Sequence, residues 1–226
     1  MKKILLASTL ALCVTSAFAA DPTAVLKLQG TLTNASCTPT LSNGGIIDYG
    51  TWRLGEMSAD EVNQLGHKNF DLSINCTAKT KVGFWVADDR SKSDSGIKIL
   101  NARANGGYVA GQTPGYGLGM TAGDVKIGSF AIYAETDSIL ADGVAVSYTS
   151  SSNQGATWTN EDLTGGVTPL GFYYYTVAEK GLSDPLAFKD VTIPMVVAAA
   201  VDSTRKLAIT DDTVMDGQAT FTIVYL

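Results

Sequence analysis

Apolar and polar residues alternate over short stretches along most of this chain, a pattern typical of β-strands with one buried face. In the first stretch, Leu26, Leu28, Gly30 and Leu32 share one face of the expected strand. Turn-forming Gly, Asn, Asp, Ser and Pro residues separate the stretches. The pattern predicts an all-β fold, an antiparallel sandwich, with strands at 25–32, 45–50, 70–76, 82–87, 125–134, 144–148, 172–177, 191–201 and 217–226.

The C-terminal stretch keeps a strict alternation up to the last residues. Ala219, Phe221, Ile223 and Tyr225 form one face of the expected strand. If this strand lies at the edge of a sheet, one row of its backbone groups has no partner and can bind a further strand.

One stretch departs from the strand pattern. Ser58 and Glu61 have the Ser-x-x-Glu spacing of a helix N-terminus, and Gly66 follows at a suitable helix end. The spacing predicts a short helix over 58–65, with a loop as the alternative.

The first nineteen residues have the order of a secretory signal peptide. Lys2 and Lys3 precede an apolar run, and the small-x-small sequence 17–19 predicts cleavage after Ala19. Cys13 lies within the apolar run and faintly resembles a lipoprotein site, but the bulky residue before it argues against a lipid anchor. We expect a signal peptide at 1–19 and one exported domain at 20–226, without a transmembrane segment.

Net charge narrows the choice of partners. The full chain carries a net charge of −6, and removal of Lys2 and Lys3 takes it to −8. An acidic exported protein is a poor ligand for nucleic acids and anionic membranes, which attract basic surfaces. We expect no nucleic-acid partner.

Two cysteines remain after the signal peptide, Cys37 and Cys76. In an oxidising compartment, such a pair is expected to form a disulfide. Their spacing matches no zinc or Cys-x-x-Cys redox motif. The cysteines therefore predict a structural bond.

Residues for catalysis are scarce. His67 is the single histidine, and the Gly-x-Ser-x-Gly motif of serine hydrolases does not occur. Carboxylates cluster at 88–89, 211–212 and Asp216, where turn formation is the main interpretation and weak Ca²⁺ binding or a glycosidase pair are alternatives. We expect no enzyme, no cofactor and no metal site.

Two segments rich in tyrosine could bind carbohydrate. The glycine-rich stretch 106–123 contains Tyr108 and Tyr116, and we interpret it as a surface loop, with ligand binding as the alternative. In 171–175, alternate aromatic residues point to opposite faces of a strand, which favours packing over a sugar-binding cluster.

At three places the sequence resembles the subunits of chaperone-usher fimbriae. These are Gly30-Thr31-Leu32-Thr33-Asn34-Ala35-Ser36-Cys37, then Leu72-Ser73-Ile74-Asn75-Cys76, and the C-terminal alternation with its penultimate Tyr225. A group of uncharacterised enterobacterial fimbrial-like proteins is more specifically similar, through 41–45, 48–50 and 88–90.

The resemblance implies an immunoglobulin-like, pilin-type sandwich that lacks its last strand and carries a disulfide between its first two strands. It implies a fimbrial subunit that reaches the cell surface through the periplasm and contributes to cell adhesion. Its partners would be a periplasmic chaperone, an outer-membrane usher and other fimbrial subunits. The excess length over a simple rod subunit is expected at 91–123 and 150–166.

The resemblance also assigns residues to assembly. The strand that faces the chaperone would present Gly217, Ala219, Phe221, Ile223 and Tyr225, and the candidate donor segment would insert Ala24, Leu26 and Leu28. This is strand addition, in which backbone bonds give affinity and alternate side chains give specificity. The alternative is a tip adhesin or secreted lectin-like protein with a host glycan as partner.

Overall fold

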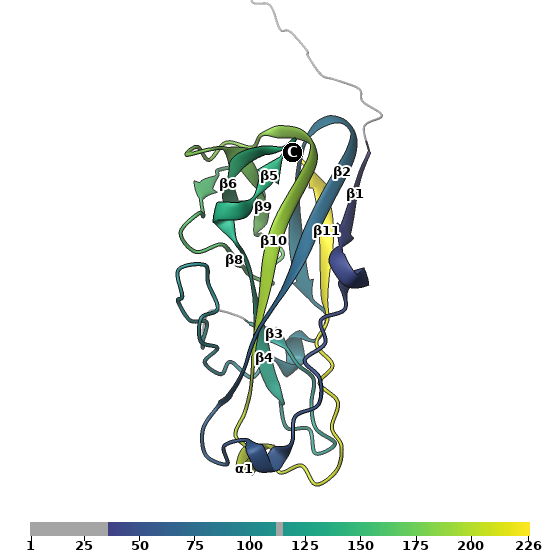
Figure 1. The fold of residues 1–226 in the computed structure, drawn as a ribbon, viewed down its shortest axis with the longest axis vertical. Helices are drawn as coiled ribbons and strands as arrows, with labels where there is room; N and C mark the ends of the chain where they lie inside the picture. Colours follow the sequence, from purple (N-terminus) through teal and green to yellow (C-terminus); the bar gives the residue numbers. More distant parts are fainter. Residues whose placement is uncertain (1–35, 112–114) are drawn as a thin grey trace, which may run out of the picture. The chain divides into compact units, whose positions relative to one another are not determined.

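A single strand of 26 residues, β2 (Asn63–Asp88), runs through the whole fold of the computed structural model, which describes residues 36–111 and 115–226. The strand arches over one end of the fold (Figure 1). Its earlier part pairs with β1 and β10, and its last seven residues, 82–88, pair with β11. One strand therefore contributes to two sheets.

The first sheet contains the longest antiparallel pairing of the described fold, between β2 and β10, which is interrupted by two register shifts. Strand β10 (Ala187–Val201) lies between β2 and β4 (Gly128–Ala134), and β1 (Cys37–Leu41) pairs with the other edge of β2. Three two-residue strands extend this sheet: β3 (Tyr116–Gly117), β5 (Leu140–Ala141) and β8 (Gly166–Val167).

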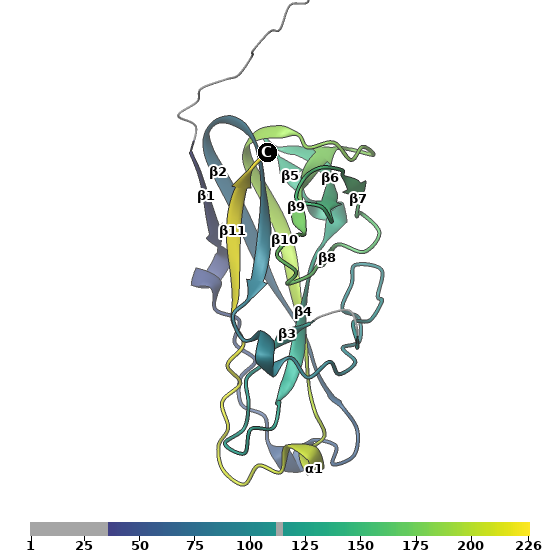
Figure 2. The ribbon, with the colours of Figure 1, turned by 180° about the vertical axis from the view of Figure 1, so that it is seen from behind.

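The second sheet is formed by the end of β2 with four further strands, which Figure 2 shows from behind. These are β11 (Ala219–Tyr225), β9 (Tyr174–Glu179), β6 (Val144–Ser151) and β7 (Thr159–Asn160). Both sheets are antiparallel throughout.

Apolar side chains from the two sheets meet in one core. Leu72 and Met195 come from the first sheet, Phe84 and Tyr175 from the second, and all four are almost fully buried. The rings of Phe84 and Tyr175 lie 5.6 Å apart. The expectation of an all-β fold with antiparallel strands is confirmed.

The helical segments of the described chain are all short. They are η1 (Ser42–Gly45), η2 (Leu54–Glu56), η3 (Ser91–Ser93), η4 (Thr136–Ser138) and α1 (Thr204–Leu207). Among the residues that the structure describes, no helix has the length and apolar character needed to cross a membrane.

The helix predicted over 58–65 is wrong. The hydroxyl of Ser58 accepts hydrogen bonds from the backbone N–H groups of Asp60 and Glu61, as it would at a helix start, but the chain then enters β2 at Asn63. The side chain of Ser58 thus stabilises a turn. Leu65 lies in a strand, where tertiary pairing overrides the local signal.

The strand predicted over 45–50 is also absent. Residues 46–50 have no regular secondary structure, and Gly50 has a positive φ of 69°. Ile47 and Tyr49 pack against the core while Ile46 and Asp48 are exposed, so the segment alternates as a strand would without pairing as one.

The strands predicted at 125–134, 144–148, 172–177, 191–201 and 217–226 coincide with β4, β6, β9, β10 and β11, apart from shifts of a few residues at their ends. The strands predicted separately at 70–76 and 82–87 are parts of the single strand β2, and β1 was not predicted. The strand expected at 25–32 and the signal peptide at 1–19 lie outside the described residues. The regions of expected excess length lie largely in the connections between β2 and β4 and between β6 and β8.

Candidate functional site: a groove beside two edge strands

Strands β1 and β11 both lie at the edge of the described fold, because each pairs only with β2. Along β11, the carbonyl of Gln218 and the N–H of Leu226 bond to the β2 side. Antiparallel residues alternate in the direction of their backbone groups, so those of Ala219, Phe221 and Ile223 point to the opposite edge. No described strand pairs with that edge.

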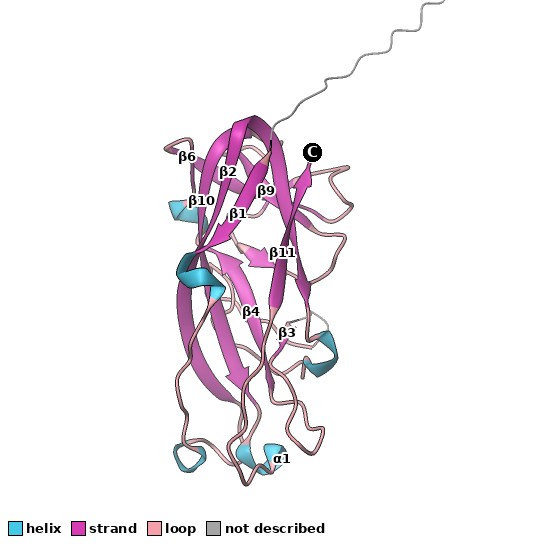
Figure 3. Cartoon of the chain, turned by 90° about the vertical axis from the view of Figure 1, so that its right-hand side faces the viewer, coloured by secondary structure: helices cyan, strands magenta, loops and turns pink. Residues whose placement is uncertain are grey.

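Beyond these strands the chain forms the two walls of a groove. Figure 3 shows β1 and β11 on the same side of the sandwich, each joined to a loop that leads towards α1. Residues 45–57, which follow β1, form one wall, and residues 211–219, which lead into β11, form the other. The groove between them has a volume of about 960 Å³.

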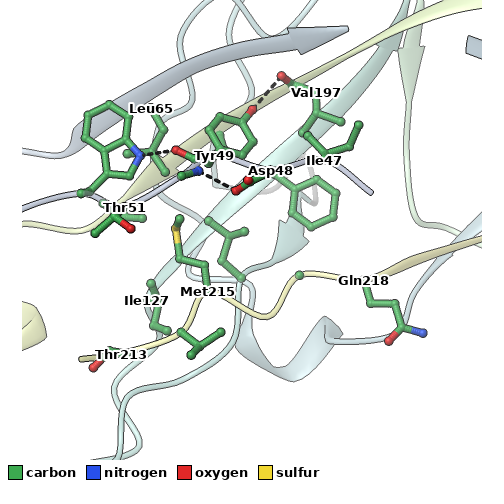
Figure 4. A pocket seen from close by; sticks show the side chains of 18 of the residues that line it. Ile47, Asp48, Tyr49, Thr51, Leu65, Ile127, Val197, Thr213, Met215 and Gln218 are labelled. Carbon is green, nitrogen blue, oxygen red and sulfur yellow. Dashed lines mark hydrogen bonds between the residues drawn. The ribbon is translucent and has the colours of Figure 1, made fainter. Parts of the chain in front are cut away.

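The floor of the groove is formed by side chains of the protein core. It consists of aliphatic and aromatic side chains, namely Leu65, Phe70, Ile127, Phe130, Ile132 and Val197. Figure 4 shows Leu65 and Val197 near Tyr49 on one side of the groove. Ile127 lies near Met215 and Thr213 on the other side. The groove is therefore lined by apolar side chains of the core, and a further strand could pack over them.

Hydrogen bonds join the segments that flank the groove, beyond both of its ends. At one end, the backbone N–H of Cys37 donates to the hydroxyl of Tyr225 at 3.0 Å. At the other end, the N–H of Thr204 donates to Ser58 O at 3.1 Å and that of Arg205 donates to Ala59 O at 3.2 Å. Between these ends, no hydrogen bond of the described residues joins 45–57 to 211–219.

Tyr49 fixes the first wall to the sheet. Its hydroxyl donates to Val197 O at 2.9 Å and lies 3.3 Å from Gly66 O (Figure 4). Burial raises the pKa of Tyr49, which keeps the phenol neutral and able to donate. Within the wall, Gly50 N donates to Asp48 and Trp52 Nε1 donates to Tyr49 O.

The second wall lies close over the core. A Cβ added to Gly217 would lie 2.8 Å from Phe130 Cε1, so a larger residue could not occupy this position without displacing the wall. Asp216 pairs with Arg90 at 2.8 Å, and its backbone N–H donates to Leu118 O. Val214 lines the groove and has 78% of its surface exposed.

The residues assigned to the assembly strand are brought together in part. Gly217, Ala219 and Phe221 line the groove, and Ile223 packs against the core. The hydroxyl of Tyr225 accepts a hydrogen bond from the N–H of Cys37 at the start of β1. The candidate donor residues Ala24, Leu26 and Leu28 lie outside the described residues.

The predicted disulfide between Cys37 and Cys76 is confirmed, with an S–S distance of 2.06 Å. It joins residues that are directly opposite each other in β1 and β2. The bond therefore fixes the start of the strand that leads into the first wall.

The carboxylate clusters hold loops in place. Asp88 accepts hydrogen bonds from the N–H groups of Arg90 and Gly117, and its burial raises the pKa of the carboxyl group. Asp89 accepts from Thr220 Oγ1. In the described ranges 36–111 and 115–226, no group of three or more His, Cys, Asp or Glu side chains could hold a metal ion.

The tyrosines of 106–123 do not form a joint ligand site. Tyr116 is fully buried and stacks on Phe130 at 4.9 Å, whereas Tyr108 is exposed beneath the ammonium group of Lys98. In 171–175, Tyr175 is buried and Phe172 is exposed, which confirms the predicted division of that cluster.

The sequence reasoning missed most of the first wall. Met57 and the exposed Trp52 line the groove, although only the pattern at 45–50 had indicated ordered structure nearby. The strand-like alternation of 45–50, without a partner strand, was the signal that could have located this wall.

The structure defines a disulfide-linked, all-β protein with an open groove at its sheet edge. The chain belongs to the family described as "Protein of unknown function (DUF1120)", whose sequence profile matches residues 26–131. "Uncharacterized protein YhcF" of Escherichia coli (strain K12) is 31% identical over 99% of this chain and 98% of its own length. "Protein GltF" of the same strain is 28% identical over 97% of this chain and 95% of its own length.

Proposed function

We propose that this chain is a structural subunit of a surface fimbria that is assembled by donor-strand exchange through a periplasmic chaperone and an outer-membrane usher, and that it contributes to cell adhesion. The observation that carries the proposal is the groove of about 960 Å³, which is lined by core side chains and lies beside the free edge of β11. An immunoglobulin-like sandwich that lacks its last strand would have this geometry.

A single extended segment could bind both the free strand edge and the apolar floor of the groove. Its backbone would pair with the free edge of Ala219–Tyr225, and alternate side chains would cover the apolar floor. Since two Leu side chains each contribute about 1.5–3 kcal/mol on full burial, such a segment would add substantial stability.

The N-terminal sequence of a second copy of this chain would suit the groove. Ala24, Leu26 and Leu28 alternate with Val25 and Lys27, as a donor strand requires. In the periplasm a strand of the chaperone would occupy the same groove first. Repeated insertion of one subunit into the next is a head-to-tail contact that does not close, and it produces a filament.

A fusion provides a direct test. A second copy of residues 21–32 is appended after Leu226 through a flexible linker, and urea unfolding of the exported protein is compared with and without it. We expect the fusion to raise the free energy of unfolding by roughly 3 kcal/mol or more, since it buries Leu26 and Leu28. The matched control carries Leu26→Asp and Leu28→Asp in the appended copy alone.

Assembly is tested by co-expression with a fimbrial periplasmic chaperone and size-exclusion chromatography. A soluble one-to-one complex, with a lower soluble yield and lower stability of the subunit expressed alone, supports the proposal. A monomer that is stable alone, ignores the chaperone and gains nothing from the appended segment would refute donor-strand exchange.

A further inference from the structure

A second, smaller pocket lies away from the groove, between residues 158–160 and 181–184. It has a volume of about 370 Å³, which is in the usual range for small-molecule sites. The first segment includes β7, which pairs with β6 in the second sheet, and the second segment follows β9 (Figure 2). We propose that this pocket binds one residue of a neutral saccharide.

The backbone of the pocket is held in place by polar side chains beneath it. The buried hydroxyl of Thr149 lies 2.9 Å from both Thr159 O and Ser183 O, so it contacts the two walls at once. Asn160 Nδ2 donates to Leu182 O at 3.3 Å and to Asp162 at 3.2 Å. The walls are thereby fixed relative to each other before any ligand arrives.

Asp162 is the centre of this support. Its carboxylate accepts from Ser147 Oγ at 2.7 Å and from the N–H of Tyr148 at 2.6 Å, and it lies 3.7 Å from the ammonium group of Lys180. Although burial acts to raise its pKa, these hydrogen bonds leave the pKa lowered, so the group is ionised at neutral pH. The ammonium group of Lys180, next to the pocket residue Gly181, is therefore already paired with Asp162.

The side chains that face the pocket remain available. No hydrogen bond or ion pair among the described residues uses the side-chain polar groups of Thr159, Ser183 or Asp184. They offer two hydroxyls and a carboxylate, which together can donate to and accept from the hydroxyls of a sugar.

The aromatic wall is Trp158, which is half-buried. A Cβ placed on Gly155 would lie 3.6 Å from Trp158 Cζ2, 3.9 Å from Tyr174 Cδ2 and 3.9 Å from Leu226 Cδ2. The indole therefore lies against Gly155, beside the end of β11. Indole provides a large rigid apolar surface for the C–H face of a pyranose ring, together with an N–H donor.

The charges at the pocket select a neutral sugar. Asp184 would repel a carboxylate such as that of sialic acid, and Lys180 is engaged by Asp162. A quaternary ammonium ligand is recognised by a cage of several aromatic faces, whereas this pocket has one.

The test uses the full exported chain in its soluble form, purified with its chaperone if required. It is screened on immobilised neutral and sialylated oligosaccharides and titrated with the methyl glycosides of galactose, glucose, mannose and N-acetylglucosamine. Choline is the cationic comparison. We expect binding of at least one neutral glycoside, with a dissociation constant of millimolar or below.

The variants are Trp158→Ala and Asp184→Asn, and we expect each to weaken that binding tenfold or more. The matched control is Tyr108→Ala, which removes an exposed aromatic ring outside both the pocket and the groove and should leave saccharide binding unchanged. Unchanged urea unfolding shows that the variants fold. Absence of neutral-saccharide binding, binding restricted to sialylated glycans or choline, or equal affinity in Trp158→Ala would each overturn the proposal.

Discussion

The hydroxyl of Tyr225 accepts a hydrogen bond of 3.0 Å from the backbone N–H of Cys37, 188 positions earlier in the chain. This bond links the start of β1 to the end of β11, beyond one end of the groove. The Tyr225 side chain is 57% exposed, so its position depends on this contact more than on burial.

Replacement of Tyr225 by Phe removes that link without changing the shape of the ring. We expect the free energy of unfolding to fall by about 0.5–1.5 kcal/mol, the usual net value of one hydrogen bond. Urea unfolding monitored by fluorescence measures it. Tyr108→Phe is the control, since Tyr108 is also exposed and its hydroxyl forms no hydrogen bond within the described chain. An equal effect of both substitutions would contradict the assigned role.

The disulfide should contribute more to the free energy of unfolding than any single hydrogen bond does. Cys37 and Cys76 are 39 positions apart, and closure of a loop of that length constrains the unfolded chain by about 3–4 kcal/mol. We expect Cys37→Ala with Cys76→Ala to lower the free energy of unfolding by about that amount. Equal unfolding midpoints for the oxidised wild type and the double variant would refute this expectation.

Val214 allows the groove to be blocked without damage to the fold. Val214→Asp places a charge on a side chain that is 78% exposed on the second wall, so the free energy of unfolding of the subunit alone should change by less than about 0.5 kcal/mol. The free energy of chaperone binding should weaken by about 1.4 kcal/mol or more, which is a tenfold loss of affinity. The stabilisation that an appended segment 21–32 provides should fall by a similar amount.

The control for this variant is Leu163→Asp. Leu163 is 72% exposed and does not line the groove. Chaperone titrations that give the same affinity for Val214→Asp and the wild type would show that the wall is not the binding surface.

We expect the burial of Tyr49 to make the protein less stable at alkaline pH. Burial raises its folded pKa above the unfolded value near 10, so its contribution is fully present below pH 10 and is lost as the pH rises through the folded pKa. Burial also raises the pKa values of Tyr116, Tyr148 and Tyr175, so these residues add to the loss of stability. We expect Tyr49→Phe to reduce the slope of unfolding free energy against pH above pH 10, measured by urea unfolding. An unchanged slope would contradict the burial of this phenol.

Strand periodicity alone located the framework of the fold. The pattern at 191–201 and the alternation of Ala219, Phe221 and Ile223 are long enough to show a buried face, and both became strands. The two-residue strands β3, β5, β7 and β8 contain only one repeat of the pattern, which is too short to show a buried face. They depend on their neighbours in space and could not be read from local sequence.

The candidate site was predicted only on the β11 side. The pattern at 45–50 describes which side chains are buried, and Ile47 and Tyr49 do face the core. It cannot show whether a neighbouring backbone is present to complete a strand. The small pocket was missed for a similar reason, since Trp158 and Asp184 are brought together only by the pairing of β6 with β7 and β9.

The position of the disulfide has a mechanical consequence. When the chain is pulled from the N-terminal side of Cys37, the load does not have to pass along the five residues of β1, because the S–S bond transfers it covalently to Cys76 in β2. Strand β1 is thus protected from being peeled away pair by pair. Tension instead enters β2, which pairs with β10 in the first sheet and with β11 in the second, so the hydrogen bonds of both pairings share it.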